Sequence, residues 1–150
     1  MKDLQYLDDF AVGQRFGSGH ITIDAKEIKR FAAEFDPQPF HMDEQAAEET
    51  LFQGLAASGW HTAALSMRLL VESDFRPAGG VIGMGFDEFR WPLPVRPGDT
   101  LTIETEILEV RPSKSQPDQG IVKARMSTFN QKHEVVQICV GNLVVKRHKA

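Results

Sequence analysis

The first clear pattern in the chain is an apolar stripe with helical spacing. Its members, at positions i, i+3, i+4 and i+7, are Ile28, Phe31, Ala32 and Phe35. This spacing places them on one face of an amphipathic helix. Asp24 and Glu27 have the spacing of a capping box ahead of the stripe, and Pro37 cannot continue a helix. The pattern therefore predicts a helix that begins after Asp24 and carries Asp36 at its C-terminal end.

The longest apolar segment spans residues 56–71 and leaves almost no polar face apart from Ser66 and Arg68. A helix that is apolar nearly all round is a buried one. The small residues of its first turn are Ala56, Ala57, Ser58 and Gly59. Small side chains allow a ligand or another backbone to approach closely. The segment therefore predicts a long buried helix that can be approached at its N-terminal end.

The second half of the chain is rich in β-prone residues, with apolar and polar positions in alternation. This pattern predicts strands at residues 81–91, 100–110, 121–129 and 134–146. A further strand is predicted at residues 16–23, where the β-prone residues are interrupted by glycines. The strands thus outnumber the helices, and most of them follow the buried helix.

Shorter segments complete the prediction. Residues up to about 12 are interpreted as an extended lead-in, residues 44–49 as a short helix after Asp43, and residues 51–55 as a turn. Residues 135–140 are apolar on both faces of the last strand, so we expect the helix on one face and a partner subunit on the other. Together the elements predict an α+β fold in which an antiparallel β-sheet wraps around a long central buried α-helix.

Composition limits the class of protein. A chain of 150 residues suits one domain, which we place over residues 1–150. The net charge of −4 argues against nucleic-acid binding through bulk positive charge. The single cysteine, Cys139, cannot form an internal disulfide, which is typical of a reducing compartment. The sequence contains no signal-peptide pattern and no segment long enough to span a membrane. We therefore expect a cytoplasmic protein without a nucleic-acid or membrane partner.

The candidate chemistry lies in the segment that follows the first predicted helix. Asp36 and His41 are separated by a stretch that contains Pro37 and Pro39. Proline fixes its own φ, lacks an N–H and disfavours the α region for the preceding residue. We therefore expect a stiff connection that is neither helix nor central strand. A carboxylate and an imidazole held at a fixed separation suit general acid–base catalysis.

Three motifs carry a resemblance to a known family. They are F-A-A-E-F-D-P-Q-P-F-H-M-D at residues 31–43, L-F-Q-G-L-A-A-S-G-W-H at 51–61 and F-R-W-P-L-P-V-R-P-G-D-T-L at 89–101. In this order they resemble the MaoC-like dehydratases, the (R)-specific enoyl-CoA hydratases of the hotdog fold. The resemblance implies a hotdog fold, a homodimer and an acyl-CoA substrate. It also implies that Asp36 and His41 are the catalytic pair.

The chain departs from the family pattern at three places. Phe35 precedes Asp36 where the family motif has glycine, and Gln38 stands where it has asparagine. Some members place a serine in the central helix near the position of Met67, and here the nearest hydroxyl belongs to Ser66.

The resemblance also implies further substrate-binding residues. The N-terminus of the central helix would offer N–H groups to a thioester oxygen at Gly59 and Ser58. Phe40, Trp60 and Leu55 are expected to line an apolar path for the acyl chain. The candidate cations for the CoA tail are Arg90, Arg96, Arg111 and Lys114. Each of these cations taken alone is more readily explained as an ordinary solvated charge.

The resulting prediction is an (R)-specific 2-enoyl-CoA hydratase or 3-hydroxyacyl-CoA dehydratase that adds water reversibly to an acyl thioester. Two alternatives remain, a hotdog acyl-CoA thioesterase and a non-catalytic acyl-CoA-binding hotdog subunit. No metal is expected, because His41, Asp43 and His61 match no zinc-site spacing. No redox cofactor is expected either, since the substrate itself carries the coenzyme A. His61, on an apolar helix, is expected to pack rather than to bind a ligand.

Overall fold

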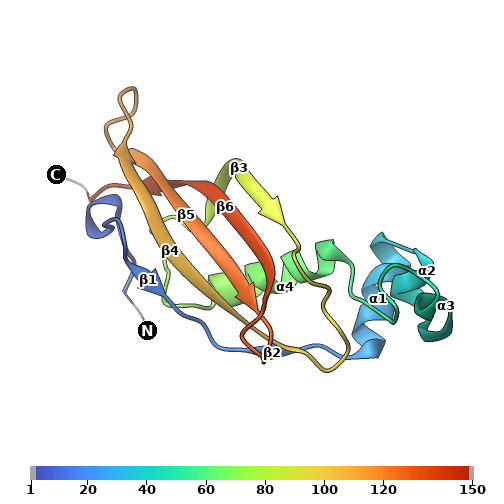
Figure 1. Ribbon diagram of the computed structural model, residues 1–150. Helices are drawn as coiled ribbons and strands as arrows, with labels where there is room; N and C mark the ends of the chain where they lie inside the picture. The colour runs from blue at the N-terminus through green and yellow to red at the C-terminus, as the bar shows by residue number, and fades with distance from the viewer. Residues whose placement is uncertain (1–2, 149–150) are drawn as a thin grey trace.

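A curved β-sheet wraps along one long helix, α4 (Gly59–Val71), in the computed structural model, which describes residues 3–148 (Figure 1). Three shorter helices gather at the end of the sheet where α4 begins (Figure 1). They are α1 (Ala25–Phe35), α2 (Pro39–Met42) and α3 (Glu44–Glu48). The predicted α+β architecture, a sheet around a central helix, is confirmed.

The sheet is antiparallel throughout. Its strands are β1 (Arg15–Phe16), β2 (Ile21–Thr22), β3 (Ile82–Arg90), β4 (Thr100–Pro112), β5 (Gln119–Phe129) and β6 (Val135–Lys146). They are ordered β1-β4-β5-β6-β3, and β2 also pairs with β4. The four long strands lie where the sequence predicts them, to within two residues at either end.

The predicted continuous strand at residues 16–23 is wrong. The chain instead forms β1 and β2, two short strands that pair with different parts of β4. Between them the Ser18 hydroxyl, and not a backbone carbonyl, accepts a hydrogen bond from the Ile103 N–H at 2.9 Å. Glycines flank this serine. Glycine weakens a strand because it loses more backbone entropy on folding than other residues and has no side chain that could pack. The break follows from both effects.

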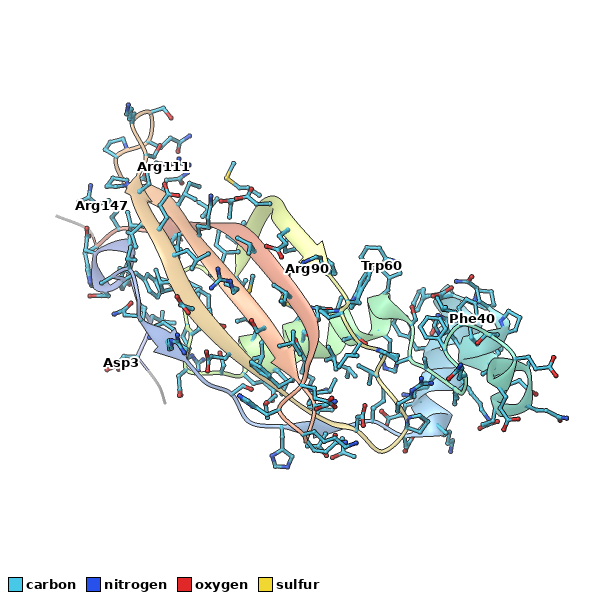
Figure 2. The ribbon with its side chains drawn as sticks, viewed as in Figure 1. Asp3, Phe40, Trp60, Arg90, Arg111 and Arg147 are labelled. Carbon is cyan, nitrogen blue, oxygen red and sulfur yellow. The ribbon has the colours of Figure 1, made fainter. Side chains whose placement is uncertain are left out.

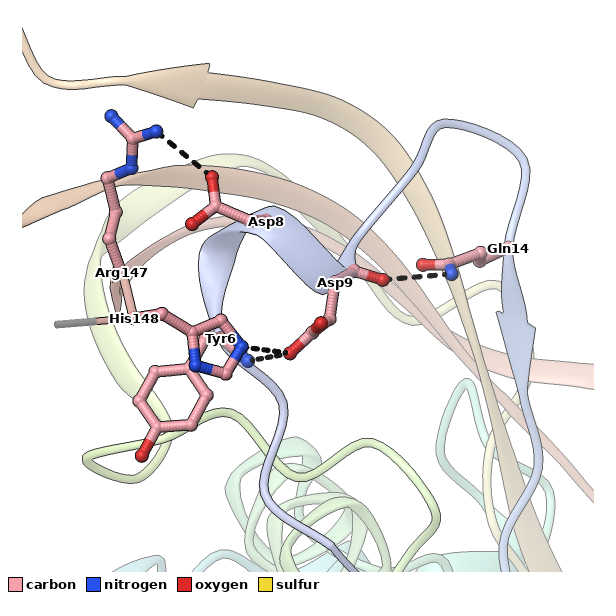
Figure 3. A network of polar contacts seen from close by, with 6 residues as sticks. All are labelled: Tyr6, Asp8, Asp9, Gln14, Arg147 and His148. Carbon is pink, nitrogen blue, oxygen red and sulfur yellow. Dashed lines mark hydrogen bonds and ion pairs between the residues drawn. The ribbon is translucent and has the colours of Figure 1, made fainter. Parts of the chain in front are cut away.

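Residues 6–9 and residues 147–148 lie side by side at the end of the sheet far from α1 to α3 (Figure 1). Arg147 forms an ion pair with Asp8 at 3.1 Å, and the His148 ring lies 3.2 Å from Asp9 and stacks on Tyr6 (Figure 3). The chain here forms a one-turn 3-10 helix, η1 (Leu7–Asp9), so the predicted extended lead-in is wrong for these residues. Positions 1 and 2 of that prediction lie outside the described residues.

Helix α1 begins as the sequence predicts. The Asp24 carboxylate accepts a hydrogen bond from the Glu27 N–H at 2.8 Å, which satisfies one of the free donors of the first turn. Ile28 and Ala32 of the apolar stripe are fully buried. Phe35, the last member of that stripe, is 65% exposed. The helix ends at Phe35, with Asp36 as its C-cap residue, because Pro37 cannot continue it.

The prediction that the Asp36–His41 connection contains no helix is wrong. Pro39 is the first residue of α2, and His41 lies within this single turn. Proline is tolerated at the first helical position because that N–H would have no intrahelical partner anyway. Helix α3 follows almost directly, with the Asp43 carboxylate capping the Ala46 N–H at 2.9 Å, as predicted to within one residue at its end.

Helix α4 begins three residues later than predicted, at Gly59. Ser58 takes the N-cap position, and its hydroxyl accepts a hydrogen bond from the Trp60 N–H at 3.3 Å, which favours a helix that starts directly after it. The side facing the sheet is buried, including Leu69 and Leu70. Its flank beside β3 is not buried, since Trp60, which contacts Phe89, is 63% exposed and Val71 is 53% exposed. Full burial of this helix was thus wrongly predicted for one chain, because a single sheet covers only one side.

Strand β3 forms an edge of the sheet and continues this exposed apolar surface. Ile82, Met84 and Phe86 are 51%, 68% and 53% exposed. An unpaired edge with apolar side chains readily accepts another strand. Within residues 3–148, none of the helices combines the length and the apolar composition that crossing a bilayer requires.

Candidate active site

Asp36 lies at the C-terminal end of α1, with its N–H bonded to the Ala32 carbonyl at 2.8 Å. The Ser58 hydroxyl donates to its Oδ2 at 2.7 Å, and the Gln38 side-chain amide donates to its Oδ1. Gln38, where the sequence departs from the family pattern, thus supplies a donor to the carboxylate. Both carboxylate oxygens accept a hydrogen bond, which favours the ionised form.

The environment of Asp36 has opposing effects on its pKa. Burial alone raises the pKa of Asp36, but the hydrogen bonds from Gln38 and Ser58, and the positive charge of the His41 ring when it is protonated, together lower it more. The net result is a pKa below the ordinary value of 3.8. The carboxylate is therefore ionised at neutral pH.

His41 is almost fully buried, with 5% of its side chain exposed. Its Nδ1 lies 2.6 Å from the Ala56 carbonyl oxygen. A carbonyl can only accept, so Nδ1 carries a proton and the neutral ring has its lone pair on Nε2. That Nε2 lies 3.3 Å from Asp36 Oδ2. The structure thus brings the two predicted catalytic groups together and determines which nitrogen faces the carboxylate.

The pair has a definite chemical capacity. With a neutral ring, the Nε2 lone pair and the ionised Asp36 carboxylate are two acceptors that face each other without a hydrogen between them. Such an arrangement binds a proton on Nε2 or a molecule that donates a hydrogen bond to both groups. The Asp36–His41 pair is therefore arranged to receive a proton.

The N-terminus of α4 lies directly beside this pair, because Ser58 donates a hydrogen bond to Asp36 and is also the N-cap residue of α4. As the N-cap residue, Ser58 accepts from the Trp60 N–H through its hydroxyl at 3.3 Å, and from the His61 and Thr62 N–H groups through its carbonyl. Within residues 3–148 no acceptor is bonded to the Gly59 N–H. A free N–H at a helix N-terminus can stabilise negative charge on a ligand oxygen.

The lack of a side chain at Gly59 is required by a neighbouring aromatic ring. A Cβ at this position would lie 2.8–2.9 Å from three atoms of the Trp91 indole. The indole N–H donates to the Gln137 side chain at 2.9 Å, and the ring contacts Trp60 and Phe89 edge to face. Trp91 therefore packs closely against the start of α4.

A cleft of about 580 Å³ opens beside His41. It is formed by the loop that precedes α4, by the start of that helix and by the segment between β3 and β4. The residues that line it include His41, Phe52, Gly59, Thr62, Trp91 and Arg96. The predicted imidazole and the predicted helix N-terminus thus share one opening.

A second, apolar cavity of about 230 Å³ lies between α4 and the sheet. Its lining includes Trp60, Met67, Phe86, Phe89, Met126 and Gln137. Three of the residues that contact Trp91, namely Trp60, Phe89 and Gln137, line this cavity, whereas Trp91 itself lines the cleft. The packed Trp91 ring therefore lies between the cleft and the cavity.

The residues predicted to bind the acyl chain occupy different places. Trp60 lines the apolar cavity. Phe40 packs perpendicular to the His41 ring, with 4.6 Å between the ring centroids, and also contacts Phe52. Leu55 is a core residue, 5% exposed. Of these three predicted residues only Trp60 borders one of the two spaces described above.

The predicted CoA-binding cations are scattered. Arg90, which lies near Trp60 in Figure 2, forms an ion pair with Glu88 at 2.6 Å. Arg111 lies at the far end of the sheet, and Lys114 lies in the loop that joins β4 to β5 there (Figure 2). Arg96 borders the cleft. Of the four predicted cations, Arg96 is therefore the one that lines the opening beside His41 within a single chain.

His61 packs as predicted. Its ring is 7% exposed and stacks on Phe31 at 4.5 Å, which joins α4 to α1. Its Nδ1 has no hydrogen-bond partner among the described residues. No group of three or more metal-binding side chains lies together in residues 3–148.

The buried His61 ring is expected to make stability depend on pH. Burial, and to a lesser extent the charge of Arg30, lowers the pKa of His61 below its ordinary value of 6.5. The unfolded chain therefore binds a proton at a higher pH than the folded chain does, and the free energy of unfolding decreases as the pH falls below 6.5. Urea unfolding at pH 7.5 and at 5.5 measures this decrease. A His61→Phe variant should show a smaller one, and an equal decrease in both proteins would contradict the assignment.

Sequence reasoning missed two parts of the site. It interpreted Gly59 as leaving room for a ligand, whereas the Trp91 ring occupies the space next to it. It also missed the Ala56 carbonyl, which fixes the proton of His41. The signal for Trp91 was its place in the third motif, two residues after Phe89. No residue type could reveal a backbone carbonyl.

Comparison with known proteins gives three informative relatives. The crystal structure of a MaoC-like dehydratase from Rhodospirillum rubrum is 54% identical, superposes with a TM-score of 0.94 and is matched over 97% of this chain and 99% of that one. The uncharacterised protein YdeM of Bacillus subtilis is 36% identical over 93% of this chain and 96% of its own. An (R)-specific enoyl-CoA hydratase of R. rubrum is 31% identical over 74% of this chain and 75% of its own.

The model of the MaoC-like domain family matches residues 9–129, a segment that contains Asp36, His41 and the whole of α4. The fold is the hotdog fold of these relatives, as the resemblance implied. The chain belongs to the MaoC-like dehydratase family.

Proposed function

We propose that this protein is an (R)-specific 2-enoyl-CoA hydratase that also catalyses the reverse dehydration of 3-hydroxyacyl-CoA. The observation that carries the proposal is the Asp36–His41 pair, in which Nε2 of the buried His41 lies 3.3 Å from Asp36 Oδ2 beside the N-terminus of α4. The membership in a family that includes an (R)-specific enoyl-CoA hydratase supports it.

In the proposed reaction, a single water molecule donates one hydrogen bond to Asp36 and a second one to His41 Nε2. As the water oxygen bonds to Cβ of the enoyl thioester, one water proton passes to the pair and the electrons of the C=C bond move toward the thioester oxygen. The pair then delivers a proton to Cα and returns to its starting state, so that one water molecule has been added across the double bond. The negative charge that develops on the thioester oxygen is stabilised by the free N–H of Gly59, and removal of such a donor typically costs about 3–4 kcal/mol of transition-state stabilisation. These steps use only protein groups and substrate, so we propose that no metal or redox cofactor takes part.

We propose that the apolar cavity between α4 and the sheet receives the acyl chain. Its lining is almost wholly hydrocarbon and aromatic, and it adjoins Trp91, which borders the cleft. The coenzyme A part would then remain on the side of the cleft. A cytoplasmic location is part of the same proposal, supported by the single buried thiol of Cys139.

The loss of enoyl-thioester absorbance, measured over a panel of acyl chain lengths, tests the reaction. Absorbance loss without free thiol supports a hydratase. Thiol release without hydration would instead establish the thioesterase. Binding of acyl-CoA without turnover of any enoyl-CoA, unchanged in Asp36→Asn, would establish the non-catalytic subunit.

We propose further that the protein is a homodimer joined through β3. The exposed side of α4 and the β3 edge together form an apolar surface, made of Trp60, Met67, Val71, Ile82, Met84 and Phe86. Monomeric proteins rarely expose a contiguous apolar surface of this kind. A second copy of β3 would pair with the free edge and would also cover the open side of α4.

A charge placed on this edge is expected to prevent dimerisation. Met84 is 68% exposed, so Met84→Lys should leave the fold of one chain intact while opposing edge pairing. Sedimentation velocity should give a dimer for the wild type and a monomer for Met84→Lys. The exposed position Lys132, in the β5–β6 turn, provides the control substitution Lys132→Glu. A wild-type monomer, or a dimeric Met84→Lys protein, would contradict the proposed interface.

A further inference from the structure

Arg96 extends its guanidinium group into the loop between α3 and α4. Its Nη1 donates to the carbonyls of Gly54 at 2.9 Å and Leu55 at 3.3 Å, and its Nη2 donates to the carbonyl of Phe52. Its own N–H donates to the Asp99 carboxylate at 2.8 Å, which fixes the start of the side chain. One planar cation thus binds three carbonyls of a single loop.

The loop that Arg96 holds contains an unfavourable backbone conformation. Gln53 has a φ of 53°, in the left-handed region that a residue with a side chain seldom adopts. A conformation of this kind persists when the surrounding contacts hold it. The carbonyls of Phe52 and Gly54, one on each side of Gln53, are both bound by Arg96. The guanidinium is thus placed to hold the loop in this shape.

The same loop orients the His41 ring. Ala56, directly after the residues that Arg96 binds, accepts the Nδ1 proton of His41 at 2.6 Å, and its N–H donates to the Phe40 carbonyl at 3.1 Å. The next residue, Ala57, donates its N–H to Val95, the neighbour of Arg96. The segment is thus held on one side by residues 95–96 and holds the imidazole on the other. Movement of the Ala56 carbonyl would break its hydrogen bond to Nδ1 and would allow the ring proton to reside on either nitrogen.

We propose that Arg96 is a positioning residue for the acid–base pair. By fixing the loop that ends at Ala56, it keeps the proton of the neutral His41 ring on Nδ1 and the lone pair of Nε2 toward Asp36. This inference rests on the proposed catalytic role of His41. It also gives Arg96 a role different from the CoA-phosphate contact predicted for it, although both roles would place Arg96 in the same cleft.

Nuclear magnetic resonance tests the proposal without any substrate. In the wild type at a pH where the ring is neutral, long-range proton–nitrogen correlations should show His41 protonated on Nδ1 alone. In Arg96→Met we expect both tautomers, because the Ala56 carbonyl is no longer held. Arg96→Lys should restore the wild-type pattern in part, since lysine supplies the charge without the planar fork. The control is Arg68→Met, which removes an exposed arginine near the C-terminal end of α4 and should change nothing.

Kinetics with two substrates separate positioning from phosphate binding. One substrate is an enoyl-CoA, and the other is the same acyl group on N-acetylcysteamine, which carries no phosphate. We expect Arg96→Met to lower kcat by about 10–10²-fold on both substrates, because misplacement of a catalytic group by about 1 Å costs up to this factor. The KM ratio between the two substrates should stay as in the wild type.

Two results would overturn the proposal. One is an unchanged His41 tautomer in Arg96→Met. The other is a rise in KM confined to the CoA thioester, which would make Arg96 a phosphate ligand. If Arg96→Met does not fold, Arg96→Lys carries the same two measurements. If the wild type hydrates neither thioester, the proposed function fails, whereas the tautomer measurement still decides the role of Arg96.

Discussion

His41→Ala is expected to lower kcat for enoyl-CoA hydration by about 10²–10⁴-fold, the usual contribution of a general acid–base group. The substitution removes Nε2, which lies 3.3 Å from Asp36 Oδ2, and leaves the carboxylate with Ser58 and Gln38 as its remaining partners. KM should change less than kcat, because the imidazole is expected to act mainly on the transferred proton. An ultraviolet assay of enoyl-thioester loss measures both constants.

The control is His20→Ala, which removes an exposed histidine from the segment between β1 and β2. It should keep wild-type kinetics. Asp36→Asn provides an independent variant, because it keeps the size of the side chain but removes the charge that faces Nε2. If the His41→Ala protein is folded and loses less than tenfold in kcat, the acid–base pair is not the catalytic group.

Gly59→Ala should have the second-largest effect. A methyl group at this position would lie 2.8–2.9 Å from the Trp91 ring, which Gln137, Trp60 and Phe89 hold in place. Either the ring or the start of α4 must move, and overpacking of this kind typically costs about 1–3 kcal/mol of stability. If the Gly59 N–H shifts as well, kcat should fall by up to about 10²–10³-fold, the usual loss for one oxyanion donor.

A double-mutant cycle with Trp91→Leu identifies the cause. In the smaller Trp91→Leu background, the added methyl group of Gly59→Ala has room, so most of its cost in unfolding free energy should disappear. Urea unfolding of the four proteins gives the coupling energy directly. An equal cost of Gly59→Ala in both backgrounds would show that the indole contact is not its source.

Local signals in the sequence predicted most of the fold. The cap at Asp24, the proline after Asp36 and the alternating second half gave α1 and the four long strands with small errors at their ends. Each of these signals acts within a few residues, so the bounds of these elements can be predicted from a single sequence. The hydroxyl of Ser18, which replaces a ladder bond to Ile103, acts across the sheet and was therefore missed.

The candidate site was predicted less completely, for the same reason. Asp36 and His41 are close in sequence and their pairing could be anticipated. The contacts that define the site come from distant segments, namely Trp91 over Gly59 and Arg96 on the loop before α4. Which side of α4 is exposed could not be predicted either, because its pattern is apolar on both sides.

The contacts between Tyr6, Asp9 and His148 join the segment around η1 to the residues after β6, at the end of the sheet opposite α1 to α3 (Figure 3). Because the Tyr6 and His148 rings stack with 4.1 Å between their centroids, a short peptide linker could join these two positions, and new termini could be opened in the β4–β5 loop to give a circular permutant. Because both segments lie at the end of the sheet opposite α1 to α3, a tag or a surface attachment placed there would leave the opening beside His41 unobstructed.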